Sequence, residues 1–298
     1  MTSSPTPIRL AAFWMAGWLA MMLVMPVAGR EAARELALVQ VMEMRSILGL
    51  LMVCPLVYRA GGMAAIRSSR PWLHIWRNLV HYLAQYGWLL AITLIPLAQV
   101  VAIEFTMPIW TAILAVTLLG ERMSGWKNAA IVLGLVGVLV IVRPGGADVG
   151  VGQLIALGTA VGFAVSITMI KSLTRTDSAL AILFWMVLVQ GAIGLLPALA
   201  VWQSPSPLTW AWIVVIAFCG TFSHYCMARA LHYADATVVV PMDFLRVPLS
   251  AVVGWLVYAE GIDAYTAVGA ALILAGNLMN LKGSGGINSK PDPRLPPI

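Results

Sequence analysis

The chain has 298 residues, of which 61% are apolar and only 10% are charged, and its mean hydropathy is +0.90. Soluble globular domains carry about a quarter charged residues, so this composition excludes an ordinary soluble domain and indicates an integral membrane protein. The net charge of +6 does not indicate nucleic-acid binding, because the basic residues are strung out between apolar stretches and form no dense patch.

Ten apolar runs have about the length that a helix needs to cross a bilayer, roughly 20 residues. In chain order we expect these spans at residues 8–28, 36–58, 72–94, 97–119, 126–142, 151–170, 179–202, 208–231, 236–258 and 264–281. The tail from Gly283 to Ile298, rich in Gly, Pro and Ser, is predicted to be disordered.

The first run could be mistaken for a signal peptide, because Arg9 precedes it. Its apolar stretch is longer than the roughly 7–15 residues of a signal core, so we interpret it as a span. Trp14 and Trp18 lie four apart on this span. They form either an aromatic wall of a site or a contact with the membrane interface, where Trp is enriched.

The distribution of Lys and Arg predicts the orientation in the membrane. With a cytoplasmic N-terminus, thirteen of the 18 basic residues fall on the inner face and three on the outer face. The remaining two, Arg45 and Arg246, lie within spans. This asymmetry predicts that both termini are cytoplasmic.

Two stretches of the chain, a constant 139 residues apart, carry the same pattern. Residues 86–137 align without a gap on residues 225–276. The matched pairs include Glu104 with Asp243, Phe105 with Phe244, Glu121 with Glu260, and Gly137 with Gly276. Five spans, an odd number, separate the copies, so the second copy is inserted upside down. Inverted repeats of this kind can open one midplane site to either side of the membrane. The alternative, that duplication only built a stable bundle, leaves the intramembrane acids unexplained.

Each half has a proline inside its fourth span and an acid that closes that span, namely Pro108 with Glu121 and Pro248 with Glu260. In this arrangement the chain resembles the drug/metabolite transporter superfamily, specifically its EamA-type ten-helix members. The second half departs from the usual Gly-Glu ending, since Ala259 precedes its acid.

The resemblance implies a fold class: an all-α integral membrane protein with ten transmembrane helices in two inverted five-helix repeats. We expect the repeats at residues 1–145 and 146–282, followed by a disordered cytoplasmic tail at 283–298. The resemblance also implies a bacterial inner-membrane location. It further implies a central cavity lined by the first, third, fourth, sixth, eighth and ninth helices.

Polar side chains recur at helical spacing inside the spans. His81, Gln85 and Trp88 follow one another at i, i+4 and i+7 in the third span, and Asp243 and Arg246 are three apart in the ninth. Residues at these spacings share a helix face, and ionisable groups inside a membrane indicate a functional site. The predicted substrate-binding residues are Arg45, His81, Gln85, Tyr86, Trp88, Glu104, Asp243 and Arg246.

The intramembrane charges differ in the partners that the sequence offers them. Glu43 and Arg45 are two apart, diverge on a helix and cannot pair with each other, so each needs a partner elsewhere. Asp243 and Arg246 can pair within one helix, which lowers the cost of both and still leaves Arg246 able to bind a substrate carboxylate.

Three prolines lie inside spans, at Pro108, Pro241 and Pro248. Each frees a carbonyl in the preceding turn, so each can act as a hinge or can line a cavity. Glu121 and Glu260 close their spans, where a solvated or capping role fits better than substrate contact.

These features predict a secondary transporter that moves a small organic metabolite by alternating access. An amino acid or related zwitterion fits the facing carboxylates and arginines; a flavin-like vitamin, stacked on the aromatic residues, is the alternative. An intramembrane enzyme is the rival class, but neither a nucleophile with its base nor an H-E-x-x-H pattern is present. The expected partners are the substrate, the lipid bilayer and, as a candidate coupling ion, the proton. We expect no cofactor, metal or nucleic acid. The direction of transport stays open.

Overall fold

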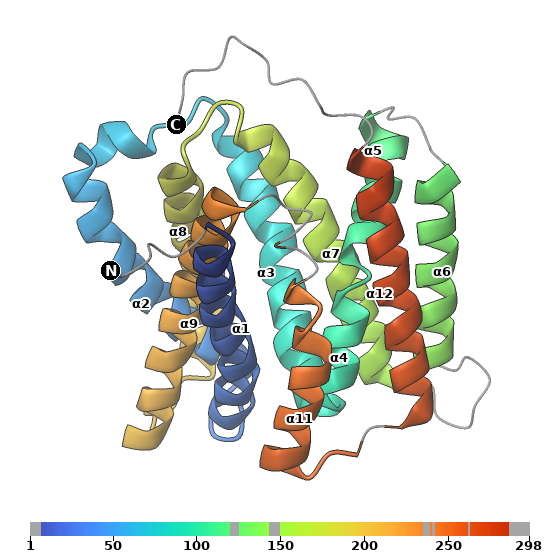
Figure 1. Ribbon diagram of the computed structural model, residues 1–298. Coiled ribbons are helices and arrows are strands. Elements are labelled where there is room, and N and C mark those ends of the chain that lie inside the picture. Colours follow the sequence, from blue (N-terminus) through green and yellow to red (C-terminus); the bar gives the residue numbers. More distant parts are fainter. Residues whose placement is uncertain are drawn as a thin grey trace, which may run out of the picture.

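The computed structural model describes residues 7–119, 125–142, 150–234, 239, 242–261 and 263–285, and these residues form a bundle of helices without a strand (Figure 1). The helices of the first half are α1 (Pro7–Ala32), α2 (Leu38–Arg59), the 3-10 helix η1 (Gly62–Ile66), α3 (Pro71–Leu94), α4 (Leu97–Glu104), α5 (Met107–Leu119) and α6 (Gly125–Val142). Those of the second half are α7 (Val151–Leu173), α8 (Ala179–Ala200), α9 (Pro207–Tyr233), α11 (Arg246–Tyr258) and α12 (Ala264–Gly285).

The described helices follow the predicted spans, apart from interruptions in the fourth and ninth, and most are apolar enough to lie in a membrane. By length and composition, six helical stretches can cross a bilayer, and α6, α11 and α12 contain shorter apolar helices. α12 extends to Gly285, a little into the predicted tail, whose remaining residues lie outside the described part of the chain. The expected boundary between the repeats, at residues 145 and 146, also lies outside it and stays a prediction.

The fourth and ninth spans differ from the single helices that the sequence predicted. The fourth is interrupted after Glu104, where α4 ends, and α5 begins at Met107 after two intervening residues. In the ninth, Phe244 and Leu245 form a turn before α11 begins. A proline ring clashes with the carbonyl four residues earlier, and Pro108 and Pro248 stand in the first turn after each interruption. The two breaks therefore occupy equivalent positions in the 139-residue register.

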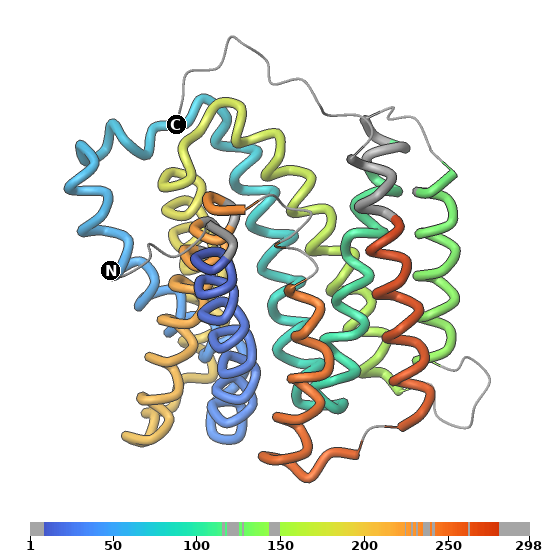
Figure 2. Tube along the Cα trace, in the orientation of Figure 1, coloured from blue at the N-terminus to red at the C-terminus, as the bar shows by residue number. Residues whose placement is uncertain are grey.

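Helix neighbours follow the symmetry of an inverted repeat. α1 packs along α9 and α3 packs along α7, while α2 pairs with α8, α6 with α12, and α4 with α11. Numbered as membrane spans, the first packs against the eighth and the third against the sixth. The second, fourth and fifth pack against the seventh, ninth and tenth, which are their equivalents in the other repeat. An axis that exchanges the halves maps this set of contacts onto itself. Figure 2 shows one such contact, with the N-terminal blue helix beside the orange segment of α9.

The contact between α6 and α12 shows the same axis at the level of single atoms. A Cβ added to Gly137 would lie 2.7 Å from the carbonyl oxygen of Gly269, and one added to Gly276 would lie 2.8 Å from that of Ala130. Gly137 and Gly276 are 139 residues apart, and so are Ala130 and Gly269. The two close approaches are thus one contact repeated, and a side chain larger than hydrogen at either glycine would force the helices apart.

Candidate functional site

The two helix breaks bring together three ionisable side chains, Glu104, Asp243 and Arg246, which we call the central ion cluster. Arg246 begins α11, and its Nη1 donates to Glu104 Oε1 at 2.9 Å. Its Nε lies 3.5 Å from Asp243 Oδ1. Glu104 belongs to the first repeat and the other two residues to the second. The cluster therefore ties the halves together where their fourth and ninth spans are broken.

The predicted pairing of Asp243 with Arg246 is present, but it is the weaker of two contacts. Because the turn at Phe244 interrupts the helix, Arg246 points across the interface and makes its shorter contact with Glu104. The sequence predicted a pair within one continuous helix. The break before Arg246 lets its side chain reach Glu104 of the other repeat as well.

Two indole groups, one from α1 and one from α3, complete the cluster. Trp88 Nε1 donates to Glu104 Oε2 at 3.0 Å, and Trp18 Nε1 donates to Asp243 Oδ1 at 2.6 Å. Each carboxylate thus receives an indole N–H besides its contact with the guanidinium. Trp88 was a predicted site residue. Trp18 was considered only as an aromatic wall or an interface residue, and sequence spacing cannot show a contact between residues 225 positions apart.

Aromatic rings from both breaks pack beside the cluster. Phe105 and Phe244, matched residues of the repeat, make an edge-to-face contact with ring centroids 5.5 Å apart. The guanidinium carbon of Arg246 lies 4.7 Å from the centroid of the Phe105 ring. Asn277 donates to the Phe105 carbonyl at 2.7 Å and so satisfies an acceptor that the break leaves outside the helix ladder. These contacts fix the cluster, although Arg246 Nε makes no hydrogen bond to any of the described residues.

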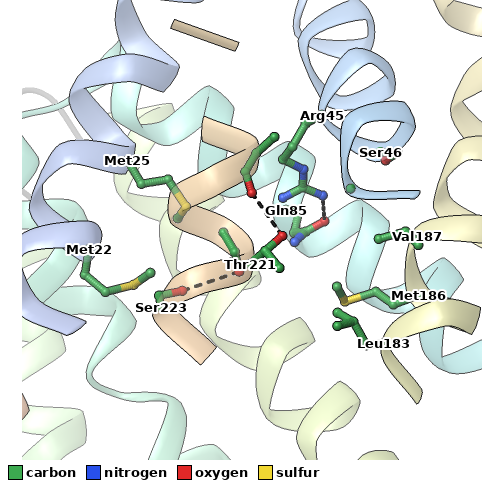
Figure 3. Close-up of a pocket in the computed structure, with 13 residues that line it drawn as sticks. Met22, Met25, Arg45, Ser46, Gln85, Leu183, Met186, Val187, Thr221 and Ser223 are labelled. Carbon is green, nitrogen blue, oxygen red and sulfur yellow. Dashed lines mark hydrogen bonds between the residues drawn. The ribbon is translucent and has the colours of Figure 1, made fainter. Parts of the chain in front are cut away.

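A second polar site surrounds Arg45, which belongs to α2. Its Nη2 donates to Gln85 Oε1 of α3 at 2.6 Å and to Gln190 Oε1 of α8 at 2.9 Å. Both partners are neutral amides, and among the described residues no carboxylate lies within ion-pair distance of Arg45. This guanidinium keeps an uncompensated positive charge inside the bundle. Figure 3 shows Arg45 pointing toward Gln85 beside the cavity.

The cavity beside Arg45, which we call the Arg45 pocket, is shared by both repeats. Its lining residues come from α1, α2, α3, α8 and α9. Three methionines contribute thioethers and three hydroxyl-bearing residues contribute polar groups: Met22, Met25, Met186, Ser46, Thr221 and Ser223. Its volume is about 90 Å³. Pockets that hold drug-sized ligands measure roughly 300–1,000 Å³, so the described conformation is contracted around the site.

One residue connects the Arg45 pocket to the central ion cluster. Met22 lines the pocket, and its sulfur also lies 4.0 Å from Nη1 of Arg246. The two polar sites are therefore neighbours across a single flexible side chain, and they form one candidate functional site with two parts.

The remaining predicted residues point elsewhere. His81 faces α7, where its Nδ1 lies 3.2 Å from the Ser166 hydroxyl and its ring packs against Phe163. Tyr86 packs against the main apolar core. The predicted polar stripe of α3 thus diverges: His81 turns to α7, Gln85 to Arg45 and Trp88 to Glu104.

The predicted hinge residues fall on different parts of the structure. Pro108 and Pro248 stand at the two breaks, and the Pro248 side chain is exposed. Pro241 and Glu121 lie outside the described residues.

At the other end of α11, Glu260 closes the bundle in the way that the capping interpretation predicted. Its Oε2 accepts from the backbone N–H of Leu97, the first residue of α4, at 2.9 Å, and its Oε1 pairs with Arg30 of α1. Arg30 also donates to the carbonyls of Ile92 and Ile95 at the end of α3. This arrangement, the Glu260 latch, joins α1, α3, α4 and α11.

Comparisons with known proteins agree with this architecture. The sequence matches the EamA-like transporter family over residues 9–143 and 150–282. An S-adenosylmethionine uptake transporter of Rickettsia prowazekii is 28% identical over 217 residues, covering 73% of this chain and 74% of that protein. A riboflavin transporter of Rhizobium johnstonii is 29% identical over 225 residues, covering 74% of each chain. A pseudopaline exporter of Pseudomonas aeruginosa is 25% identical over 253 residues, covering 84% of this chain and 88% of that one.

A solved crystal structure superposes on 94% of this chain and 99% of its own with a TM-score of 0.63 at 18% identity, which supports the fold alone. The two family matches cover nearly the whole sequence and correspond to the two five-span halves that the repeat predicted. The chain is a multi-pass membrane protein and belongs to the EamA-like transporter family.

Proposed function

We propose that this protein is a carrier that moves a small organic metabolite across a bacterial inner membrane by alternating access, and that Arg45 binds the acceptor-rich end of the substrate. The proposal depends on one observation above all. Arg45 is a cation inside the bundle, beside a cavity shared by both repeats, and the described residues give it two neutral amides and no carboxylate. A substrate carboxylate would supply the missing charge.

The geometry of arginine favours such a ligand. A guanidinium offers five N–H donors in a planar fork that matches a carboxylate with two parallel hydrogen bonds. Both contacts that Arg45 makes to Gln85 and Gln190 use the same nitrogen, Nη2. Those amides orient the side chain. Arg246, by contrast, already faces two carboxylates, so we assign it to holding the two halves together rather than to the substrate.

The substrate class that we favour carries a zwitterionic amino-acid end. S-adenosylmethionine, named for one set of relatives, is an amino-acid derivative with a carboxylate, an ammonium, a sulfonium and an adenosine group. The carboxylate would bind Arg45, and the hydroxyls of Ser46, Thr221 and Ser223 are acceptors for the ammonium. The thioethers of the pocket adapt to irregular ligand surfaces.

A flavin-like substrate is the second candidate, because relatives of similar identity are riboflavin transporters. The flavin ring is flat and carries carbonyl oxygens. These oxygens can accept hydrogen bonds from Arg45, and the face of the ring can pack against the thioethers of the pocket. It has no carboxylate, so its affinity would depend less on the positive charge of Arg45. This difference separates the two candidates experimentally.

Alternating access requires the contracted pocket to open, and the Glu260 latch is the contact that would release on one side. It joins α1 to the ends of α3, α4 and α11, which surround the site. By the orientation inferred from basic residues, the latch lies on the outer face. We propose that its release opens the Arg45 pocket outward.

Uptake into proteoliposomes tests the substrate class. Labelled S-adenosylmethionine, riboflavin and methionine would be offered to the parent protein, to Arg45→Gln and to the matched control Arg34→Gln, which removes an arginine whose side chain is 65% exposed. We expect Arg45→Gln to weaken binding of a carboxylate-bearing substrate about 10- to 100-fold, the loss of one charged hydrogen-bonded contact. Riboflavin binding should fall less, and the control should behave as the parent.

Unchanged binding of every transported probe by Arg45→Gln would contradict the proposed site. Turnover of any probe to a covalent product by the purified protein would contradict a carrier. A parent protein that transports none of the three probes would exclude this substrate class.

Labelling of single cysteines tests the proposed orientation. Ser69, in the loop before α3, and Ser204, in the loop before α9, are both exposed. In a background without the exposed Cys54, a cysteine at Ser69 should react only with reagents admitted to the cytoplasm, and one at Ser204 only from outside. Labelling of both from the same side would overturn the inverted arrangement.

A further inference from the structure

One carboxyl oxygen of Glu43, Oε2, is buried without a hydrogen-bond partner among the described residues. The residue is 3% exposed and lies in the second turn of α2. Its Oε2 contacts no solvent and no hydrogen-bond donor among the described residues. The group instead packs against α8, where Oε2 is 2.6 Å from the position that a Cβ on Gly194 would occupy, and Oε1 is 3.8 Å from the corresponding position on Gly191.

Tyr82 of α3 also packs against Gly194 of α8. Its hydroxyl oxygen is 3.0 Å from the Cβ position of Gly194, and it too lacks a hydrogen-bond partner in the described structure. Tyr82 interacts electrostatically with Glu43 and with Arg45. Glu43, Tyr82 and Arg45 therefore share the junction of α2, α3 and α8, although Glu43 and Arg45 diverge on their own helix.

The other helices packed against α2 offer Glu43 no cation. From Ala179 to Ala200, α8 has no ionisable side chain, and η1 has none. On α9, which runs parallel to α2, ionisable residues begin only at Cys219, well past the level of the second turn. On α3 the facing group is the Tyr82 phenol. The buried cation of α3, Arg77, contacts Asn78, which bonds to the Trp185 carbonyl of α8, nine residues before Gly194. On α2 itself the nearest cation in sequence is Arg45.

An ionised carboxylate in such a place would be costly, because the described residues give Oε2 no hydrogen-bond donor and pair Glu43 with no cation. Buried acids of this kind take up a proton and become neutral. The paired carboxylates Glu104 and Asp243 differ, since each has a guanidinium and an indole N–H.

We propose that Glu43 is the proton-binding residue of this carrier, protonated in the described conformation and deprotonated to water when the junction of α2, α3 and α8 opens. The inference rests on the proposed transport function, and it names the ion that would be coupled to it. In one cycle the carboxyl takes one proton from one side of the membrane and releases it to the other.

The neighbourhood of Arg45 sets the direction of coupling. Glu43 and Arg45 both interact electrostatically with Tyr82, so a negative charge on Glu43 would disfavour a second carboxylate, that of the substrate, at the same junction. Protonation removes this competing charge, so proton binding and substrate binding favour each other, as linkage requires for both ligands. Proton and substrate should therefore travel together.

Infrared spectroscopy tests the protonation of Glu43 without any substrate. A protonated carboxylic acid has a C=O stretching band apart from those of carboxylates and amides. We expect the purified parent protein to show such a band, Glu43→Gln to lose it, and Glu43→Asp to keep a shifted one. The control Glu35→Gln, which alters an exposed carboxylate bonded to Ser206 and Thr209, should leave the band unchanged. A band that survives Glu43→Gln, or that Glu43→Asp fails to shift, would overturn the proposal.

Transport of riboflavin and S-adenosylmethionine in proteoliposomes tests the coupling. The parent should accumulate a transported probe when an inward proton gradient is imposed. Glu43→Gln should exchange labelled for unlabelled probe as the parent does, yet lose accumulation driven by the gradient. Accumulation that persists in Glu43→Gln would overturn the proposal. If neither probe is transported, the substrate class fails, whereas the infrared result still decides the role of Glu43.

Discussion

Arg45 and Arg246 both lie inside the bundle, and the protein treats their charges in opposite ways. Arg246 stands between Glu104 and Asp243, with the Phe105 ring beside it. Arg45 has two amide oxygens and a cavity. A buried cation with its own counter-ions has little left for a ligand, whereas one without them is available to an anion. The comparison separates a residue that holds the two repeats together from one that we expect to bind substrate.

The largest effect should follow from removing the compensated arginine. Arg246→Gln leaves two carboxylates buried without their cation, and breaking a buried pair in this way costs about 3–5 kcal/mol. Thermal and denaturant unfolding of the purified protein in detergent should show this loss.

Removing the acids as well should restore part of the stability. The shorter contact to Glu104 predicts that Glu104→Gln combined with Arg246→Gln is more stable than Arg246→Gln alone, and that it recovers more than Asp243→Asn with Arg246→Gln does. Equal stability of the single and double variants would show that the cluster carries no coupling between the repeats. Normal transport by the double variant would show that the cluster is structural only.

The indole donors provide a second, smaller test of compensation. Trp18→Phe and Trp88→Phe each remove one N–H from a buried carboxylate but keep most of the aromatic surface. A hydrogen bond to a charged group contributes about 1.5–3 kcal/mol, so each variant should lose that amount of unfolding free energy. The exposed Trp72 offers the matched control Trp72→Phe, which should change stability little. A loss at Trp18 no larger than that of the control would contradict the contact with Asp243.

Replacing Arg45, the arginine without a counter-ion, should weaken substrate binding and leave stability nearly unchanged. Arg45→Gln orphans no carboxylate, and its glutamine can still contact Gln85, so we expect unfolding free energy within about 1 kcal/mol of the parent. Binding of a carboxylate-bearing substrate should fall nonetheless. Measuring stability and binding on the same preparation distinguishes the two arginines. A large loss of stability in Arg45→Gln would mean that this residue, like Arg246, supports the fold.

The sequence was sufficient for the architecture and for the charged residues, and insufficient for their partners. Glu104 and Asp243 were found because a 139-residue repeat places an acid in an apolar span twice. The prolines indicated perturbed helices, yet only the fold shows that the breaks fall at Phe105 and Phe244 and let Arg246 reach Glu104. Local spacing describes one helix face, whereas these contacts join helices that are far apart in the chain.

The same limit explains why some residues were missed or differently placed. Trp18 contributes to the site because α1 also packs against α11 and the residues before it, and Gln190 contributes because α8 packs against α2; no periodicity encodes these pairings. His81 shares a predicted stripe with Gln85, but the neighbour that it meets is α7. A helix with three different neighbours divides one polar stripe among them.

The smallest expected effect concerns a carboxylate outside the spans, whose negative charge is stabilised by neighbouring hydrogen-bond donors. Asp177, in the turn between α7 and α8, lies at 2.6 Å from both the Ser68 hydroxyl and Nε2 of His74. Burial opposes its ionisation, but hydrogen bonds from Ser68, His74 and Thr176 outweigh this effect and lower the pKa of Asp177 below its ordinary value. Because the folded-state pKa is the lower one, the stabilisation is present above the unfolded value of about 3.9 and is lost as pH falls through the folded value.

Unfolding measured between neutral pH and about pH 3 should therefore show a loss of stability at the acidic end, the range around the ordinary aspartate pKa. Asp177→Asn should remove this dependence. Ser68→Ala, which takes away one donor, should move the loss of stability toward higher pH, because the carboxyl then titrates closer to its ordinary value. An identical acid profile for the parent and Asp177→Asn would mean that neutral donors and a histidine do not compensate this carboxylate.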